Sequence, residues 1–392
     1  MYKDHAELAE LQAAENAGGY IEKWEAPSEY NGLPVTVLGH FGEENASSVF
    51  TGITKLIVPD SVTKIYPEFL RSVSFPEEIE VAEGNPVYRC IDGVLFYEDH
   101  TLVYYPETKE DTEYTVPEGT VTIEEEAFHS ETLQSLVVPD SVTTIGDRAF
   151  RDCDCLVSAQ IGTGVEIIPA GAFDGCSELV SVSLPEGLRE IHAYAFDITD
   201  SKLHDIVLPS TVESIGNSAF RVSEDFGEII LPESLKYMDR SAFGADKYED
   251  ENAVFVQESL RIPAGLEFDP SMLDGVSLKR YEIAEDNPYH SVTEDGVLMS
   301  KDGRTLVAVP GQMEGSFEIP EGVEKIEYGA FDEANSLSDV YLPDSILDVG
   351  NLGEDPNWFD DIDGCSYKIH CHEGTEAQKQ LDAKGIEWVK IE

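Results

Sequence analysis

The feature that most constrains this chain is a repeat of about 23 residues between Leu133 and Phe243. Each copy ends in an Ala-Phe pair, and successive phenylalanines lie 23, 23, 24 and 23 residues apart. The pairs are Ala149-Phe150, Ala172-Phe173, Ala195-Phe196, Ala219-Phe220 and Ala242-Phe243. A fixed period of this length is typical of a solenoid, in which each repeat forms one coil. One coil cannot bury its own apolar residues, so the core forms only between stacked coils.

The apolar positions give the phase of each coil. Leu179, Val182 and Leu184 have Leu-x-x-Leu-x-Leu spacing, and alternation points Val182 and Leu184 to one face of a short strand. Pro185 follows directly, where a residue without an amide hydrogen suits the end of a strand. We therefore expect stacked parallel strands on one wall and a buried phenylalanine column on the other. The equivalent inward strand residues are Leu136, Val182, Ile206 and Ile229.

Small or hydroxyl side chains recur at the turn, three residues after the last strand leucine. They are Ser61, Ser141, Gly164, Gly187, Thr211, Ser234 and Ser345. A hydroxyl group can pair with backbone groups of the turn that would otherwise be buried without a partner. The pattern predicts a ladder of such contacts along the coils.

The repeat resembles the BspA-type leucine-rich repeats of bacterial surface proteins. The residues that carry this resemblance are Leu208-Pro-Ser-Thr-Val-Glu-Ser-Ile-Gly-Asn-Ser-Ala-Phe220 and Val138-Pro-Asp-Ser-Val-Thr-Thr-Ile-Gly-Asp-Arg-Ala-Phe150. The resemblance covers roughly residues 20–392. It implies a β-rich leucine-rich-repeat solenoid with little helix, and a secreted or wall-attached module with a role in adhesion.

Three regions are expected along the chain. Residues 1–32 hold an N-terminal helix over 4–17 and a capping strand over 20–24, and residues 33–365 form the solenoid. Residues 366–392 form a strand–helix–strand cap, with the helix over 375–383 and Gly385 as its end. Two inserts that resemble each other interrupt the period near 79–116 and 281–319, and each is predicted to form a β-hairpin. Both contain an Asn-Pro pair, at Asn85-Pro86 and Asn287-Pro288.

The charge of the chain limits its partners. It has 79 acidic and 25 basic residues, which gives a net charge of −54. Nucleic acid and anionic membranes are disfavoured because like charges repel. No stretch is long and apolar enough to form a transmembrane segment. The sequence shows no signal peptide, so the protein is either cytoplasmic or trimmed, and the family resemblance favours a trimmed extracellular or cell-surface protein. We also expect a monomer.

Two clusters were considered as metal sites. His370, Cys371 and His372, with Cys365 upstream, contain ligand types but lack a second ligand cluster, so a capping strand is the favoured interpretation. Asp360, Asp361 and Asp363 are weak calcium candidates, because the segment fails the EF-hand pattern and a solvated acidic loop explains it. We expect neither a metal nor another cofactor. Cys153 and Cys176 occupy the same repeat position, where buried free thiols are favoured over a disulfide.

The two inserts differ in their aromatic residues. Tyr97, Tyr104 and Tyr105 of the first insert are replaced by Ser300, Ala308 and Val309 in the second. Tyrosines that the module can lose could be exposed, and exposed tyrosines favour recognition, so these three are candidate ligand-binding residues. The alternative is that they pack against the adjoining coils.

These features favour a non-catalytic surface protein that binds a protein or glycan, which could come from a host. The first alternative is a structural spacer within a larger wall-anchored protein. An enzyme is a distant third, because no Ser, His and Asp residues share a catalytic motif. The sequence does not name the ligand.

Overall fold

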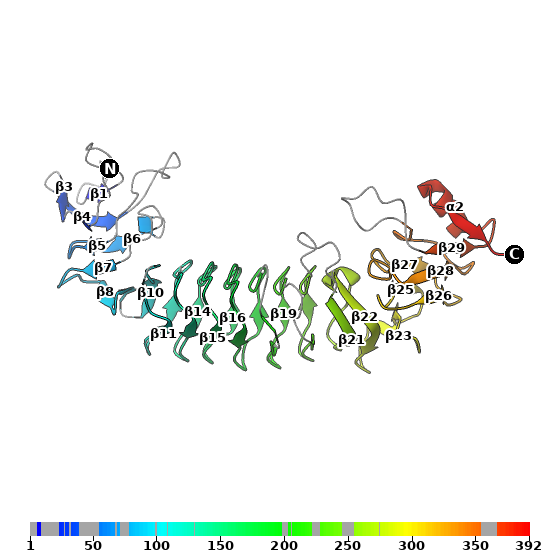
Figure 1. The fold of residues 1–392 in the computed structure, drawn as a ribbon, viewed down its shortest axis with the longest axis horizontal. Helices are drawn as coiled ribbons and strands as arrows, with labels where there is room; N and C mark the ends of the chain where they lie inside the picture. The colour runs from blue at the N-terminus through cyan, green and yellow to red at the C-terminus, as the bar shows by residue number, and fades with distance from the viewer. Residues whose placement is uncertain are drawn as a thin grey trace. The chain divides into compact units, whose positions relative to one another are not determined.

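The computed structural model divides into two compact units, residues 1–185 and 186–392, which we describe separately. The residues described are 6–8, 23–26, 28–30, 33–38, 55–66, 69–70, 78–98, 100–107, 109–128, 130–197, 203–204, 206–221, 228–244, 255–273, 275–353 and 367–392. In each unit, short parallel strands stack along the solenoid (Figure 1). The predicted β-solenoid of leucine-rich-repeat type is therefore confirmed.

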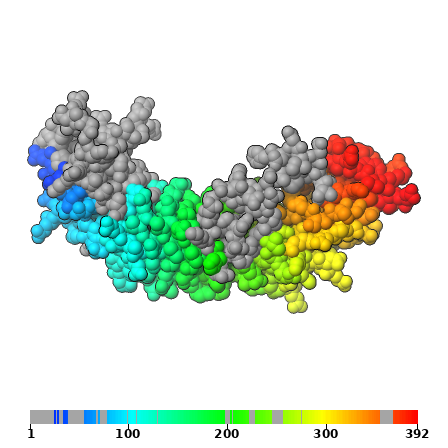
Figure 2. Space-filling view, in the orientation of Figure 1, coloured from blue at the N-terminus to red at the C-terminus, as the bar shows by residue number. Residues whose placement is uncertain are grey.

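The coils of the first unit contribute one strand to each of two walls. On the first wall, β11 (Glu113–Thr115), β13 (Ser135–Val137), β15 (Ser158–Gln160) and β17 (Ser181–Ser183) pair in parallel. Leu136 aligns with Ala159, and Ala159 with Val182, and all three are buried as the strand alternation requires. The second wall contains β12 (Thr122–Ile123), β14 (Thr144–Ile145) and β16 (Ile167–Ile168). Figure 2 shows these coils, in cyan to green, as one closely packed surface.

The second unit begins with the same coil plan. Its β18 (Glu190–Ile191), β19 (Ser214–Ile215) and β20 (Tyr237–Met238) pair in parallel on the second wall. On the first wall Ile229 is buried as predicted, whereas Ile206 is only half-buried, and neither residues 206–209 nor residues 228–231 form the predicted strand. Two longer parallel strands follow, β21 (Phe255–Ile262) and β22 (Val276–Ile283), with the 3-10 helix η1 (Pro270–Leu273) between them.

The phenylalanine column is confirmed within each unit. In the first unit, the ring centroids of Phe128 and Phe150 are 5.1 Å apart, and those of Phe150 and Phe173 are 5.0 Å apart. In the second unit, Phe220 stacks between Phe196 and Phe243 at 5.2 and 5.0 Å. All of these rings are buried. The repeat period thus places like rings in contact in successive coils.

A left-handed backbone bend precedes each of these phenylalanines by two residues. The bend residue has φ between 49° and 60° where it is not glycine, and it is Glu126, Arg148, Tyr194, Ser218 or Ser241. Gly171 and Gly329 occupy the same position in other coils with φ of 62° and 80°. This conformation costs an L-residue roughly 1–2 kcal/mol, so the coil path, rather than the residue type, imposes the bend.

The predicted hydroxyl ladder is present at Ser141, Thr211, Ser234 and Ser345, but the buried Ser61 Oγ has no hydrogen-bond partner among the described residues. Ser141 Oγ accepts from Gly119 N at 3.0 Å, and Ser345 Oγ accepts from Gly322 N and donates to Val323 O. Thr211 Oγ1 makes the same pair of bonds to the preceding coil. Where the position is Gly164, a Cβ atom would lie 2.4 Å from the carbonyl oxygen of Asp140, so only glycine fits.

The predicted N-terminal capping strand is confirmed, but the predicted N-terminal helix is wrong where it is described. The strand β2 (Lys23–Glu25) pairs in parallel with β5 (Lys55–Val58), as a capping strand should, and β5 pairs with β7 (Glu78–Val81). Residues Ala6–Leu8 form strand β1 instead of the predicted helix, because they pair with β4 (Leu33–Leu38). The rest of the predicted helix lies outside the described residues. The short strands β3 (Glu29–Tyr30) and β6 (Lys64–Ile65) also pair with β4.

The C-terminal cap follows the prediction. β26 (Gly315–Glu318), β28 (Leu337–Tyr341), β29 (Lys368–Cys371) and β30 (Trp388–Lys390) form one parallel sheet. Helix α2 (Glu376–Lys384) lies between the last two strands. Thr375 caps its start by accepting from Gln378 N, and Gly385 ends it with φ of 75°. Leu381 of the helix is buried in the core of this end.

Each insert contains the predicted hairpin and one additional strand. The first insert, residues 85–106, has β8 (Tyr88–Ile91), β9 (Val94–Tyr97) and β10 (Thr101–Tyr104). The second insert, residues 287–310, has β23 (His290–Val292), β24 (Leu298–Ser300) and β25 (Thr305–Ala308). The last strand of each then pairs in parallel with a second-wall strand, β10 with β12 and β25 with β27 (Lys325–Ile326). The inserts are therefore part of the solenoid wall.

Candidate ligand-binding site

Equivalent asparagines join the two inserts to the coils that precede them. Asn287 Nδ2 donates to the carbonyl oxygens of Pro263 and Leu266, and its Oδ1 accepts from the amides of Tyr289 and His290. Asn85 makes the same four contacts in the first insert. Both side chains are buried. The two inserts can therefore be compared residue by residue.

The third residue after each asparagine accepts an equivalent hydrogen bond in the two inserts. Tyr88 Oη accepts from Ile65 N at 2.8 Å, and His290 Nε2 accepts from Phe268 N at 2.9 Å. Burial raises the pKa of Tyr88 to about 12 and lowers the pKa of His290, so both side chains stay neutral near pH 7. His290 thus replaces a tyrosine with a smaller ring and keeps its hydrogen bond.

The prediction that Tyr97, Tyr104 and Tyr105 form an exposed patch is wrong. Tyr104 and Tyr105 are only 2% and 0% exposed. The Tyr105 ring stacks on Phe128 with centroids 4.8 Å apart, so it extends the phenylalanine column. Tyr97 is half-buried and packs edge-on to Tyr88 at 5.4 Å. The pairing of β9 with β10 shifts register between Leu102 and Tyr104, which breaks the alternation assumed from the sequence.

In the second insert, smaller residues follow the same backbone path. Val309 N donates to Ala330 O at 2.8 Å, just as Tyr105 N donates to Ala127 O at 2.8 Å. His290 pairs with Ser300 across the strands, as Tyr88 pairs with Tyr97. The second insert therefore lacks three phenol rings on a backbone path that both inserts share. Hollows are found beside Ser300, Ala308 and Val309.

The first hollow, which we call the Ala308 hollow, has a volume of about 450 Å³. It is lined by Val309, which takes the place of Tyr105 and is smaller than an aromatic residue, and by Leu273. Tyr281 and the exposed Tyr328 contribute aromatic surface. Its polar lining residues are Arg240, Ser241, Asp269, Ser271, Asp332, Glu333 and Asn351.

The second hollow, which we call the Ser300 hollow, has a volume of about 600 Å³. Its apolar lining residues are Met238, Leu266, Phe268, Met272 and Val307. Its polar and aromatic lining residues are Lys236, Tyr237, Glu267, Asp269, Tyr289, His290, Ser300, Thr305 and Glu327. The lining of this hollow thus mixes apolar, aromatic and charged side chains.

The fold explains why the second hollow opens on the second wall. The coil of residues 255–273 has no strand on that wall, and residues 266–269 have no regular structure. The amide of Phe268 bonds to the His290 ring in place of a strand neighbour. The wall is thus interrupted between β20 and β25, and the Ser300 hollow is lined by residues of both strands.

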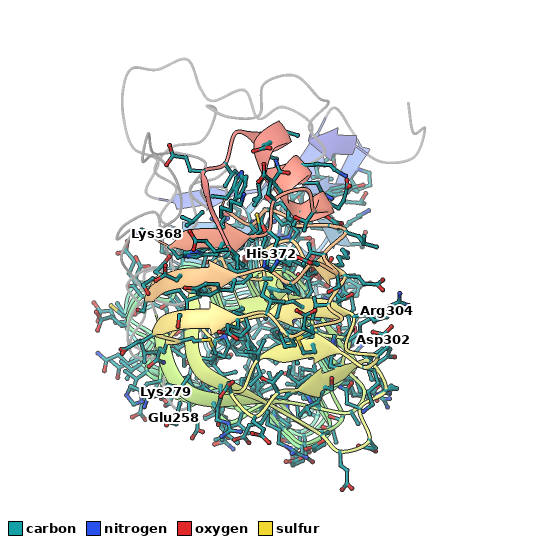
Figure 3. All side chains as sticks on the ribbon, turned by 90° about the vertical axis from the view of Figure 1, so that its right-hand side faces the viewer. Glu258, Lys279, Asp302, Arg304, Lys368 and His372 are labelled. Carbon is teal, nitrogen blue, oxygen red and sulfur yellow. The ribbon has the colours of Figure 1, made fainter. Side chains whose placement is uncertain are left out.

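One charged group at the rim of the Ser300 hollow is paired with a neighbouring coil. Lys236 on the rim bonds to Glu213 at 2.6 Å, and Glu213 also accepts from Arg189. Figure 3 shows Asp302 and Arg304 of the β24–β25 turn on one side of the unit and the Glu258–Lys279 ion pair on the other. The Lys236–Glu213 and Glu258–Lys279 pairs connect adjacent coils, but exposed pairs of this kind contribute little stability.

The other candidates from the sequence do not form a site among the described residues. His370 bonds to Asp339 at 2.7 Å and His372 to Asp344 at 2.8 Å, while Cys371 is buried. The described part of the chain has no group of three potential metal ligands. Asp360, Asp361, Asp363 and Cys365 lie outside it.

The two equivalent cysteines are buried and free, as predicted. Cys176 Sγ donates to Phe150 O at 3.1 Å, and burial raises the pKa of Cys153 to about 12. Thiols that remain protonated are poor nucleophiles, so these two serve as core residues.

No helix within the described ranges has the length and apolar character needed to cross a bilayer.

Comparison with known proteins identifies the repeats. Residues 121–249 and 314–352 match six copies of the BspA type leucine rich repeat region. A leucine rich cell surface protein from Faecalibacterium prausnitzii has a similar structure, with 25% identity over 69% of this chain and 74% of that chain and a TM-score of 0.51. No curated protein matches the sequence significantly.

Two further solved structures are leucine-rich repeat proteins. The one from Eubacterium ventriosum is 23% identical over 56% of this chain, with a TM-score of 0.45, and the match spans 63% of its own length, which is less than two thirds. The one from Bacteroides ovatus is 18% identical over 94% of this chain and 91% of that chain, with a TM-score of 0.47. The family model, and not these two structures, confirms the resemblance, and it does so over residues 121–249 and 314–352, which match BspA-type leucine-rich repeats.

Proposed function

We propose that this protein is a non-catalytic recognition protein of a bacterial cell surface, and that it binds its ligand at the Ser300 and Ala308 hollows. The repeat type and the similarity to a leucine rich cell surface protein support the class and the location. The observation that carries the site is the loss of three tyrosines from the second insert, next to hollows of about 450 and 600 Å³.

Exposed aromatic residues surround these hollows and support a binding role. Tyr237 and Tyr289 at the Ser300 hollow are 54% and 41% exposed, and Tyr328 at the Ala308 hollow is 60% exposed. Tyrosine is enriched among residues that dominate binding energies, because it gives a large contact area and one hydrogen-bonding group. Packing does not require these three rings, since much of each lies in solvent.

The polar groups of the Ser300 hollow support binding over catalysis. The Nε2 atom of His290 already accepts from Phe268 N, so this histidine is committed to the fold and is a poor general base. The carboxylates of Glu267, Asp269 and Glu327 lie in the lining. Together with the net charge of −54, they disfavour polyanionic ligands and favour neutral or cationic ones.

The test is to refill the hollows with the side chains that the first insert carries. Ser300→Tyr restores the equivalent of Tyr97, and Ala308→Tyr restores the equivalent of Tyr104. Ser316→Tyr is the matched control, because Ser316 is exposed on β26 and lines neither hollow. The labelled proteins are applied to cells and to arrays of matrix proteins and glycans.

We expect each filling variant to lose most of its retention on the bound target, while Ser316→Tyr keeps it. Equal melting temperatures would show that all variants remain folded. If the filled proteins are retained as well as the control, the hollows are not the site. If the unaltered protein is not retained by any target, the spacer alternative replaces the recognition function.

A further inference from the structure

We propose that the Ser300 hollow binds the unmodified tyrosine side chain of a protein partner. This inference rests on the proposed function and narrows the ligand class. Its starting point is the first insert, which shows how this frame holds a phenol ring. Tyr97 sits across the strand pair from Tyr88, and Ser300 sits across the same pair from His290.

The geometry of the first insert defines where the ring of the partner would lie. The Tyr97 ring packs edge-on to Tyr88 with centroids 5.4 Å apart and contacts the adjoining core. His290 keeps the hydrogen bond of Tyr88, so its ring is fixed in the corresponding place. A ring that enters the Ser300 hollow can therefore make the edge-on contact with the imidazole that Tyr97 makes with a phenol.

The position is reached from solvent. Tyr97 is half-buried, so the frame leaves this place partly open to solvent even when a ring fills it. With Ser300 there instead, the hollow has about 600 Å³, within the roughly 300–1,000 Å³ typical of ligand pockets. One phenol ring does not fill that space, so residues that flank the tyrosine of the partner would also contact the lining.

The apolar lining suits an aromatic ring better than a sugar. Met238 and Met272 contribute thioether sulfurs, and Phe268 contributes a ring. Sulfur–aromatic and ring–ring contacts each stabilise an aromatic guest. The polyhydroxylated faces of a sugar would lose water against these side chains without replacement hydrogen bonds.

The charges at the rim of the Ser300 hollow favour an unmodified tyrosine ring over a phosphorylated one. Glu267 and Asp269 are exposed carboxylates at the hollow, and a phenol hydroxyl group can donate to either. Lys236 is paired with Glu213, so its charge is partly neutralised. A phosphorylated tyrosine would bring a second anion against these carboxylates and would be repelled. The chemistry therefore favours unmodified tyrosine.

The experiment uses the full chain and saturation-transfer NMR with N-acetyl-tyrosinamide. Parallel probes are N-acetyl-phenylalaninamide, N-acetyl-phosphotyrosinamide and a set of methyl glycosides. We expect tyrosinamide to bind at least tenfold more tightly than phosphotyrosinamide. Ser300→Tyr should abolish the signal, and Ser316→Tyr should retain it.

A second variant protects the test against a folding failure. Glu267→Lys replaces an exposed side chain, so the fold should tolerate it. It should reduce the preference for tyrosinamide over phosphotyrosinamide at least threefold, because it reverses one charge on the rim. An unchanged preference in this folded variant would overturn the assigned ring position.

Different outcomes would refute the tyrosine assignment and the proposed binding function of the Ser300 hollow. Binding of a methyl glycoside but not of tyrosinamide would overturn the tyrosine assignment and leave the recognition function intact. The same conclusion follows if no probe binds while Ser300→Tyr still abolishes retention on target cells. If Ser300→Tyr keeps retention on cells, the proposed function of this hollow fails, whatever tyrosinamide does.

Discussion

Replacing Asn287 by alanine should sharply reduce the stability of the second unit. Its side chain is buried and makes four hydrogen bonds, two as donor to Pro263 O and Leu266 O and two as acceptor from Tyr289 N and His290 N. Alanine removes all four. The backbone groups would lose their partners on both sides of the insert.

The expected cost follows from these contacts. A net contribution of about 0.5–1.5 kcal/mol per bond gives a loss of about 2–6 kcal/mol in the free energy of unfolding. We expect the upper half of this range, because four backbone groups stay buried without partners. Asn217→Ala is the control, since the Asn217 side chain is more exposed and donates one bond, to Arg240 O at 2.7 Å. It should cost no more than about 1 kcal/mol.

Urea unfolding monitored by circular dichroism measures the loss, with hydrogen exchange as a local readout. Long repeat arrays can unfold in more than one step, so the local readout is needed. The amides of Tyr289 and His290 should exchange faster in Asn287→Ala but not in Asn217→Ala. If both variants lose the same small amount and these amides stay protected, the proposed role of the asparagine is wrong.

Substitutions at four further positions test other parts of the fold. Phe220→Ala should cost about 3–5 kcal/mol in thermal or urea unfolding, because a ring buried between two others is removed; a loss below 1 kcal/mol would contradict the column. Tyr105→Phe should raise the free energy of unfolding by about 1 kcal/mol, since the buried hydroxyl group has no hydrogen-bond partner among the described residues; a comparable loss would show a missed bond. Ser218→Gly should raise the free energy of unfolding by about 0.5–1 kcal/mol, because Ser218 has a φ of 49°, which glycine adopts without strain; Ser218→Val should lower the free energy of unfolding. Burial lowers the pKa of His290 below 6.5, so the unfolded chain binds the proton more readily and the free energy of unfolding falls as pH falls through 6.5. His290→Tyr should reduce this loss between pH 7 and pH 5 in parallel thermal melts. Identical pH profiles for the two proteins would refute this prediction.

The sequence alone determined the parts of the fold that repeat. A residue in a regular coil contacts the equivalent residues of the coils on either side. The period that identifies Phe150 therefore also identifies its neighbours, Phe128 and Phe173. For the same reason the ladder at Ser141 and the cap at Thr375 and Gly385 could be predicted from local patterns. The N-terminal helix was wrong at Ala6–Leu8 because a strand partner, β4, outweighed the local periodicity.

Only the tertiary structure decided the roles of the insert residues. Sequence comparison found that tyrosines at 97, 104 and 105 become Ser300, Ala308 and Val309, but it did not show which side of the wall they face. Their burial depends on a register shift in β10 and on the adjoining coils, neither of which has a sequence period. The same comparison could have indicated the hollows, had the tyrosines been taken as core. The physical reason is that packing volume is set by neighbours distant in sequence, so a missing ring leaves a space that only the assembled coils define.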